Sequence, residues 1–252
     1  MIGNACPFLT TLNLNYTSVP PASVLGPLTC CTNLEVLKVA GVQNWASKHN
    51  INYHCIFDSY NDPIQTDATF AKLLAGLAKE PGMVLPRMKN LKFRQLGLSE
   101  TSIYTFISIW PNLTCLDVSF TRLHRLPPST ATPTHALEKL SLTSTALSST
   151  DIVSLISTLP NLRTLYLGAL GSGQGSSASI SNISVMTMTD DTLTFLTDIM
   201  ANFEHLEKFS LVGNTKLGLT SRHDEHGALA DAIRRVGRKC KVVLTQLIGH
   251  TS

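Results

Sequence analysis

The sequence predicts an α/β solenoid, a stack of about seven to eight repeats that each contribute one short strand and one helix. Three observations carry this. Of the 252 residues 43% are hydrophobic and only 15% are charged, so the chain can bury a large core. One spacing of apolar residues, apolar-x-x-apolar-x-apolar, recurs along the chain. A helical spacing follows most of its copies, as in repeats that stack their strands into a parallel sheet.

The strand spacing occurs seven times. Six copies match fully: Leu9-Leu12-Leu14, Leu34-Leu37-Val39, Leu113-Leu116-Val118, Leu137-Leu140-Leu142, Leu162-Leu165-Leu167 and Leu206-Phe209-Leu211. The seventh, Leu91-Arg94-Leu96, places Arg94 where an apolar residue should be buried. Because an unpaired buried charge costs several kcal/mol, we expect Arg94 either to meet a carboxylate or to be moved out by a local change of register.

Five segments carry the helical spacing of apolar residues. They lie at 70–77, 103–110, 152–159, 193–203 and 229–236. Residues that favour helix starts precede two of them, at Ser149-Thr150-Asp151 and at Thr189-Asp190-Asp191. The sequence therefore predicts that strands and helices alternate.

Some repeats also share their opening residues. Cys6-Pro7-Phe8-Leu9, Cys31-Thr32-Asn33-Leu34 and Trp110-Pro111-Asn112-Leu113 resemble the repeat opening of leucine-rich repeat proteins of the ribonuclease-inhibitor-like, cysteine-containing type. This resemblance implies a horseshoe-shaped leucine-rich repeat solenoid with a curved parallel sheet on its concave face. In that family a small polar residue three positions past the last strand leucine turns the chain. The matching residues here are Thr17, Ser99, Thr121, Thr145 and Asn214.

We expect a single domain over residues 1–252, with two inserts at 43–66 and 169–188. Both would leave the solenoid after a strand and on the same rim. The second insert holds a Gly/Ser-rich run at 171–177, which we interpret as a flexible linker because no Gly-Lys-Ser/Thr follows it. Ala5-Cys6-Pro7-Phe8 resembles the end of a helix, so an N-terminal cap is expected to be missing and apolar surface to be exposed there.

Several functional classes are disfavoured. A net charge of +3 that is spread along the chain does not predict nucleic-acid binding, and no apolar run is long enough for a membrane span. We interpret the one basic cluster, Arg234-Arg235 with Arg238, Lys239 and Lys241, as the end of a predicted helix, where cations complement the helix dipole, rather than as a phosphate-binding patch. The six cysteines form no CxxC pair and are predicted to be reduced thiols of a cytoplasmic or nuclear protein. His223 and His226 lack a third ligand, so we predict no metal and no cofactor. No nucleophile stands with a base at a recognisable spacing, so we predict no enzyme.

Candidate partner-binding residues follow from the alternation of side chains along a strand, which turns the residues between buried leucines toward the concave face. Those selected are Lys38, Phe93, Gln95, Asp117, Lys139, Tyr166 and Lys208. The alternative is a merely solvated sheet face, but the two aromatic residues favour binding. Trp45, Tyr53 and Tyr60 in the first insert are either recognition residues or residues that pack the insert onto the solenoid.

The leading hypothesis is a non-enzymatic protein-interaction module. The resemblance extends to the substrate-recognition part of F-box ubiquitin-ligase subunits, although no F-box precedes Leu9; cullin-ligase components would be partners if a longer form carried one. A stand-alone scaffold or enzyme inhibitor is the alternative. A GTPase-activating regulator built on the same repeats is a third, which no group of residues supports.

Overall fold

The computed structural model describes residues 6–15, 31–40, 85–94, 109–119, 121, 123, 136–168, 188–212, 214, 228–238 and 240–243. The chain divides into two compact units, each described by itself below. Unit 1 comprises Met1–Leu123 with Pro127–Ala136, and unit 2 comprises His124–Leu126 with Leu137–Ser252.

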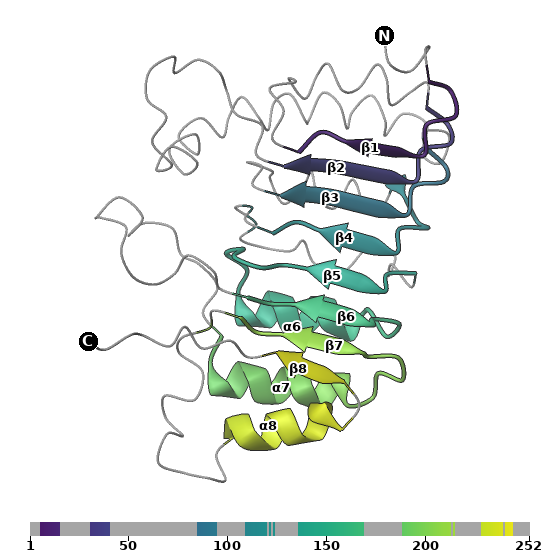
Figure 1. Ribbon diagram of the computed structural model, residues 1–252. Helices are drawn as coiled ribbons and strands as arrows, with labels where there is room; N and C mark the ends of the chain where they lie inside the picture. The colour runs from purple at the N-terminus through teal and green to yellow at the C-terminus, as the bar shows by residue number, and fades with distance from the viewer. Residues whose placement is uncertain are drawn as a thin grey trace, which may run out of the picture. The chain divides into compact units, whose positions relative to one another are not determined.

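Unit 1 contains four described strands, β1 (Thr11–Asn13), β2 (Val36–Ala40), β3 (Asn90–Arg94) and β4 (Cys115–Asp117). Each is parallel to the next one along the chain (Figure 1). The register aligns Leu12, Leu37, Leu91 and Leu116 across the strands, and the last three of these are buried. One leucine per repeat thus forms a continuous apolar column.

Unit 2 contains four further described strands, β5 (Lys139–Ser141), β6 (Thr164–Tyr166), β7 (Lys208–Ser210) and β8 (Lys241–Val243). They are again parallel in sequence order. Helices α6 (Ser149–Ser157), α7 (Asp190–Met200) and α8 (Ala228–Gly237) alternate with them and lie on one face of these strands (Figure 1). An apolar column of the same kind runs across these strands, with one residue from each strand in register: Leu140, Leu165, Phe209 and Val242.

Short polar side chains begin the helices of unit 2. The Ser148 hydroxyl accepts a hydrogen bond from the backbone N–H of Asp151 at 3.1 Å, and the Thr189 hydroxyl accepts one from Thr192 at 3.3 Å. Ser148 is therefore the N-cap of helix α6, which begins at Ser149. The sequence pattern had placed the capping residues at 149–151, one position later. Both caps supply hydrogen-bond acceptors for backbone N–H groups of the first turn, which have no acceptor within the helix.

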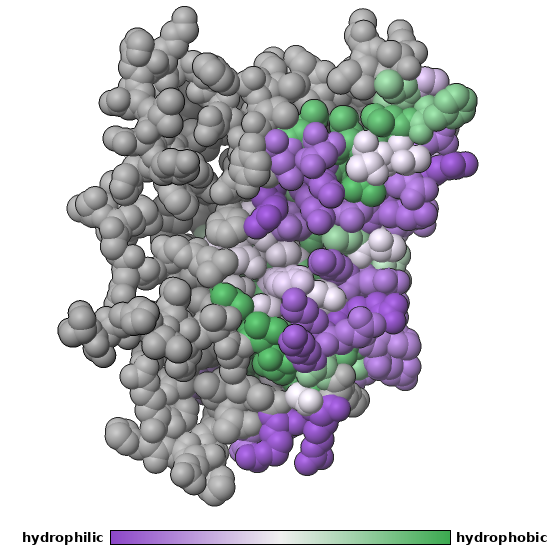
Figure 2. Space-filling view, viewed as in Figure 1, coloured by the Kyte–Doolittle hydropathy of each residue, from purple (hydrophilic) through white to green (hydrophobic). Residues whose placement is uncertain are grey.

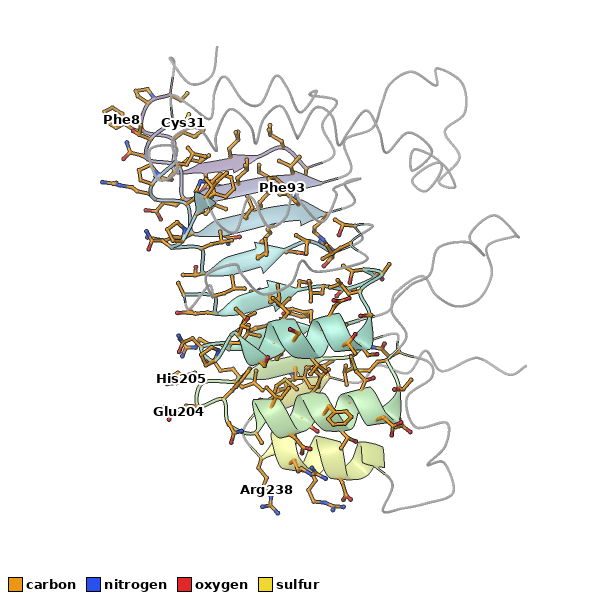
Figure 3. The ribbon with its side chains drawn as sticks, turned by 180° about the vertical axis from the view of Figure 1, so that it is seen from behind. Phe8, Cys31, Phe93, Glu204, His205 and Arg238 are labelled. Carbon is orange, nitrogen blue, oxygen red and sulfur yellow. The ribbon has the colours of Figure 1, made fainter. Side chains whose placement is uncertain are left out.

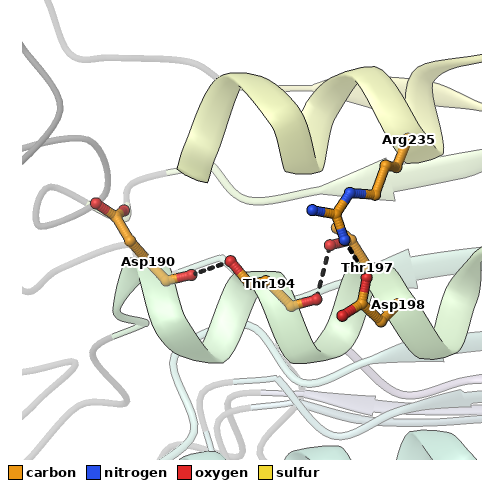
Figure 4. A network of polar contacts seen from close by, with 5 residues as sticks. All are labelled: Asp190, Thr194, Thr197, Asp198 and Arg235. Carbon is orange, nitrogen blue, oxygen red and sulfur yellow. Dashed lines mark hydrogen bonds and ion pairs between the residues drawn. The ribbon is translucent and has the colours of Figure 1, made fainter. Parts of the chain in front are cut away.

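Helices α7 and α8 lie against each other, and polar side chains stand along and between them (Figure 4). Thr197 is fully buried on α7, and its hydroxyl donates to the carbonyl oxygen of Thr194 at 2.9 Å, so its polar atom is satisfied within the helix. Arg235 of α8 forms an ion pair with Asp198 of α7. This ion pair joins α8 to α7.

Parallel strands follow sequence order in both units, and helices alternate with them in unit 2, which is the fold of a leucine-rich repeat solenoid of the α/β class, as the sequence predicts. A common turn opens the repeats. The backbone N–H of Leu34 donates to the carbonyl of Cys31 at 2.9 Å, and Leu113 donates to Trp110 at 3.1 Å. The aligned opening residues therefore have the same local conformation.

The predicted repeat Leu91-Arg94-Leu96 is wrong by three residues. Strand β3 pairs Leu37 with Leu91 and Val39 with Phe93, so the buried residues of this repeat are Met88, Leu91 and Phe93. Arg94 is exposed on the opposite face, where its Nε lies 3.6 Å from Oδ2 of Asp117. Arg94 thus has a carboxylate partner, one of the two expected outcomes, whereas no local change of register is found, because β3 pairs with β2 without interruption and the predicted alignment itself was shifted.

Strand β8 was not predicted. Lys241 was interpreted as part of a basic cluster at the end of a helix, whereas it begins this strand. Arg234 and Arg235 do lie in the last turn of α8, where positive charge complements the helix dipole.

The polar turn positions behave as the family resemblance implies wherever they are described. The hydroxyl of Thr121 donates to Val118 O at 2.7 Å, and that of Thr145 donates to Leu142 O at 3.0 Å. Nδ2 of Asn214 reaches Leu211 O at 2.9 Å and also Leu167 O, on the neighbouring repeat, at 2.8 Å. These bonds satisfy carbonyls just past the strands.

Other sequence predictions lie outside the described residues: the inserts at 43–66 and 169–187, the helices at 70–77 and 103–108, and the turn residue Thr17. Ser99 also lies outside them, and its assignment as a turn residue loses its basis because it was counted from Leu96 in the corrected repeat. In the first described repeat Phe8 is 84% exposed, and Leu9, Leu12 and Leu14 are only partly buried. This agrees with the apolar surface expected there, while the missing cap stays a prediction.

Candidate binding face

In each unit the residues that alternate with the apolar column form a second surface, called the open face here. Figure 2 shows hydrophilic side chains gathered along the described strands, with smaller hydrophobic areas between them. In unit 1 the open face consists of Thr11, Asn13, Val36, Lys38, Asn90, Lys92, Arg94, Cys115 and Asp117. In unit 2 it consists of Lys139, Ser141, Thr164, Tyr166, Lys208, Ser210, Lys241 and Val243. The three described helices of unit 2 lie on the other side of its strands.

The open face of unit 2 is built around one tyrosine. Tyr166 lies on β6, and the ammonium groups of Lys139 on β5 and Lys208 on β7 are 5.5 Å and 4.9 Å from the centroid of its ring. Such contacts are worth about 0.5–1 kcal/mol each at exposed sites. Lys241 on β8 is in register with Lys208, so a third cation stands beside this group.

The arrangement of these lysines is not explained by stability alone. Like charges on neighbouring positions of a sheet repel each other, and Lys208 and Lys241 occupy paired positions. Among the described residues no carboxylate lies within ion-pair distance of Lys139, Lys208 or Lys241. The face therefore presents positive charge that its own strands do not neutralise.

The open face of unit 1 is also charged but is partly neutralised. Lys38, Lys92 and Asp117 follow one another in register on β2, β3 and β4. The Asp117 carboxylate faces Arg94 and also accepts a hydrogen bond from the backbone N–H of Ser119 at 3.1 Å. This carboxylate is thus held by groups of its own unit.

Five of the predicted site residues lie on an open face: Lys38, Asp117, Lys139, Tyr166 and Lys208. The predicted position of Phe93 on this face is wrong, because the strand register turns this side chain to the opposite face of β3, where it is only 2% exposed (Figure 3). Gln95, Trp45, Tyr53 and Tyr60 lie outside the described residues. The sequence interpretation missed Lys92, Arg94 and Lys241. The signal that finds the first two is the alternative spacing Met88-Leu91-Phe93.

None of the four described cysteines takes part in a disulfide bond. Cys31, Cys115 and Cys240 are buried, and Cys6 is exposed. Burial raises the pKa of the Cys240 thiol, which keeps it protonated and unreactive near neutral pH. Within the described part of the chain, no group of three His, Cys, Asp or Glu residues could hold a metal ion. His223 and His226 are outside it. No described helix is both long and apolar enough to cross a membrane.

Three solved structures resemble this chain at low sequence identity. Internalin C2 from Listeria monocytogenes is 15% identical, with a TM-score of 0.47 over 94% of this chain and 80% of that one. A leucine-rich repeat protein of Leptospira interrogans is 14% identical, with a TM-score of 0.40 over 93% of this chain and 48% of that one. TLR13, in a complex with ssRNA13, is 18% identical, with a TM-score of 0.40 over 95% of this chain and 33% of that one. The chain thus spans less than half the length of the last two. Neither a protein-family model nor a curated protein sequence matches it.

Proposed function

We propose that this protein is a non-enzymatic protein-interaction module whose partner binds the open face of its sheet. The observation that carries the proposal is Tyr166, a partly buried aromatic residue on the face that the described helices leave uncovered, flanked by two lysines. Tyrosine and tryptophan are enriched among the residues that dominate binding energy. A face that only meets solvent does not require this aromatic side chain.

The geometry supports an anchoring role for Tyr166. Its ring is held between residues of β5 and β7, so little side-chain freedom is left to lose when a partner covers it. Short strands joined to packed helices give the ring a rigid support, as a preformed binding site needs.

A finer form of the proposal is the substrate-recognition part of an F-box type ubiquitin-ligase subunit. It rests on the resemblance of the cysteine-containing repeat openings to those of such subunits. In the opening at 31–34, Cys31 is buried and its carbonyl accepts the hydrogen bond of the shared turn. A stand-alone scaffold or enzyme inhibitor is the alternative form. The two differ in the partner, because only the first predicts cullin-ligase components.

The test is quantitative affinity capture with the full chain and two variants. Tyr166→Ala should weaken capture of the specific partner about tenfold or more, as for a residue that contributes over about 1.4 kcal/mol to binding. Phe195→Ala is the matched control, because Phe195 is an aromatic residue 64% exposed on α7. The control should bind like the wild type, and both variants should keep their melting temperature to within a few degrees.

The outcome tests the proposed binding face and distinguishes the F-box form of the proposal from the inhibitor form. Loss of the partner in Phe195→Ala but not in Tyr166→Ala contradicts the proposed face. Recovery of cullin-ligase components supports the F-box form, whereas recovery of one abundant enzyme in their absence supports the inhibitor form.

A further inference from the structure

The open face of β5–β8 gathers positive charge from residues that are far apart in the sequence. Lys139, Lys208 and Lys241 come from three strands and occupy one register row, together with Thr164. Neighbouring strands lie about 4.8 Å apart, so this row spans about 14 Å from β5 to β8. All other described residues of this open face are uncharged: Ser141, Thr164, Tyr166, Ser210 and Val243.

The nearest acidic residues do not neutralise this row. Glu138 and Glu207 directly precede β5 and β7 in the sequence, so they lie one position before the row that holds the three lysines. Oε1 of Glu207 lies 2.8 Å from NH2 of Arg163, so this carboxylate is already paired. A partner that approaches the open face therefore meets three ammonium groups.

From this charge complementarity we propose that the β5–β8 open face binds an acidic, extended segment of a protein partner. This assignment rests on the proposed function and names the partner's chemistry. Lys139, Lys208 and Lys241 hold carboxylates, while the exposed edge of Tyr166 packs against the segment. In an extended chain, residues i and i+4 lie about 13 Å apart, which matches the length of the lysine row.

A protein segment fits this face better than a nucleic acid does. Single-stranded nucleic acids bind where a positively charged groove is combined with aromatic rings whose faces are open for bases to stack on. The ring of Tyr166 already has the ammonium groups of Lys139 and Lys208 over it. The lysines that flank the ring are instead placed to pair with carboxylates next to it.

The experiment selects binders of the full chain from a library of short random peptides and measures the affinity of the most enriched sequence. We expect enrichment of peptides with acidic residues spread over an extended stretch. Replacing their Glu and Asp by Gln and Asn should weaken binding about tenfold or more, and so should the triple variant Lys139→Glu, Lys208→Glu, Lys241→Glu. Raising the salt concentration should weaken it as well.

A control variant of equal charge change is Arg87→Glu, Arg234→Glu, Arg238→Glu, in which all three arginines are exposed and none lies on the open face of unit 2. It should bind the selected peptide like the wild type. Three results overturn the inference: no acidic enrichment, an equal loss of affinity in the control, or tighter binding of a single-stranded RNA of the same charge. A natural partner that requires Tyr166 but tolerates the three lysine reversals also overturns it and leaves the proposed function standing.

Discussion

Strands β1–β4 and β5–β8 bury the same kind of residue but expose different chemistry. In both groups a column of apolar residues, mostly leucine, is buried in register. On the open face of β1–β4 the carboxylate of Asp117 lies beside Arg94. On that of β5–β8 two lysines, Lys139 and Lys208, flank Tyr166, and Lys241 stands in register with Lys208; no carboxylate of the described residues pairs with any of the three.

The difference shows which positions of a repeat are free to vary. The apolar column fixes the strand register, because a slip of one residue would move it to the other face. The alternate positions carry no such constraint, so their charge can suit a partner rather than the fold. The comparison therefore supports the proposal that a partner is recognised on the open face, most clearly on β5–β8.

The largest expected effect is a difference in the free energy of unfolding between variants at two neighbouring residues of β6, Leu165 and Tyr166. Leu165→Ala should destabilise the protein by about 2–5 kcal/mol, because it leaves a cavity at a fully buried site. Leu37→Ala, at the equivalent position of β2, should cost a similar amount. Tyr166→Ala should cost only about 1 kcal/mol, chiefly through its contacts with lysines.

Urea denaturation measures all three. If Tyr166→Ala destabilised the protein as much as Leu165→Ala, the tyrosine would belong to the core, and the distinction between the two faces of β6 would fail.

A smaller effect tests how tightly the strand ends of unit 2 are held. A Cβ atom at Gly168 would lie 2.7 Å from the carbonyl oxygen of Val212 and 3.1 Å from Cγ2 of Thr143. Because backbone cannot move aside freely, Gly168→Ala should cost about 1–3 kcal/mol. Since Gly168 follows Tyr166 by two residues, the same change should also weaken peptide binding at the open face.

Thermal unfolding measures the loss, with Ser154→Ala on the exposed side of α6 as the control. An unchanged melting temperature for Gly168→Ala would mean that neighbouring repeats do not approach this closely.

Much of the fold follows from local spacing in the sequence. Leucines such as Leu140 and Leu165 recur at fixed intervals because each must fill the same column, and this repetition is visible without a structure. The error at β3 arose where two spacings overlap. Leu91 fits both of them, and the spacing with more leucines placed Arg94 in the core. The cost of a buried charge favours Met88-Leu91-Phe93 instead, so the physical argument was available in the sequence.

The site was less predictable. Strand β8 carries valines instead of the leucine pattern, so Lys241 was assigned to a helix end. The lysines around Tyr166 also look dispersed along the sequence, because only the strand register brings them together. Charge on a repeat protein must therefore be counted across neighbouring repeats.

The smallest expected effect concerns the charges themselves. Arg94→Gln removes one partner of the Asp117 ion pair and should destabilise the protein by about 0.2–1 kcal/mol at low salt. Lys241→Gln removes an exposed cation next to Lys208, so it should leave stability unchanged or raise it by a few tenths of a kcal/mol. Both effects should shrink as the salt concentration rises, because Arg94 and Lys241 are exposed to solvent.

A double-mutant cycle of Arg94→Gln with Asp117→Asn isolates the pair energy in unit 1. Two results would show that the open faces do not differ in how their charges are balanced. One is a coupling energy near zero between Arg94 and Asp117, and the other is a loss of stability in Lys241→Gln as large as that in Arg94→Gln. Opposite signs for the two substitutions would instead support the assignment of the unbalanced lysines on β5–β8 to a partner, since a charge that does not stabilise the fold is free to serve binding.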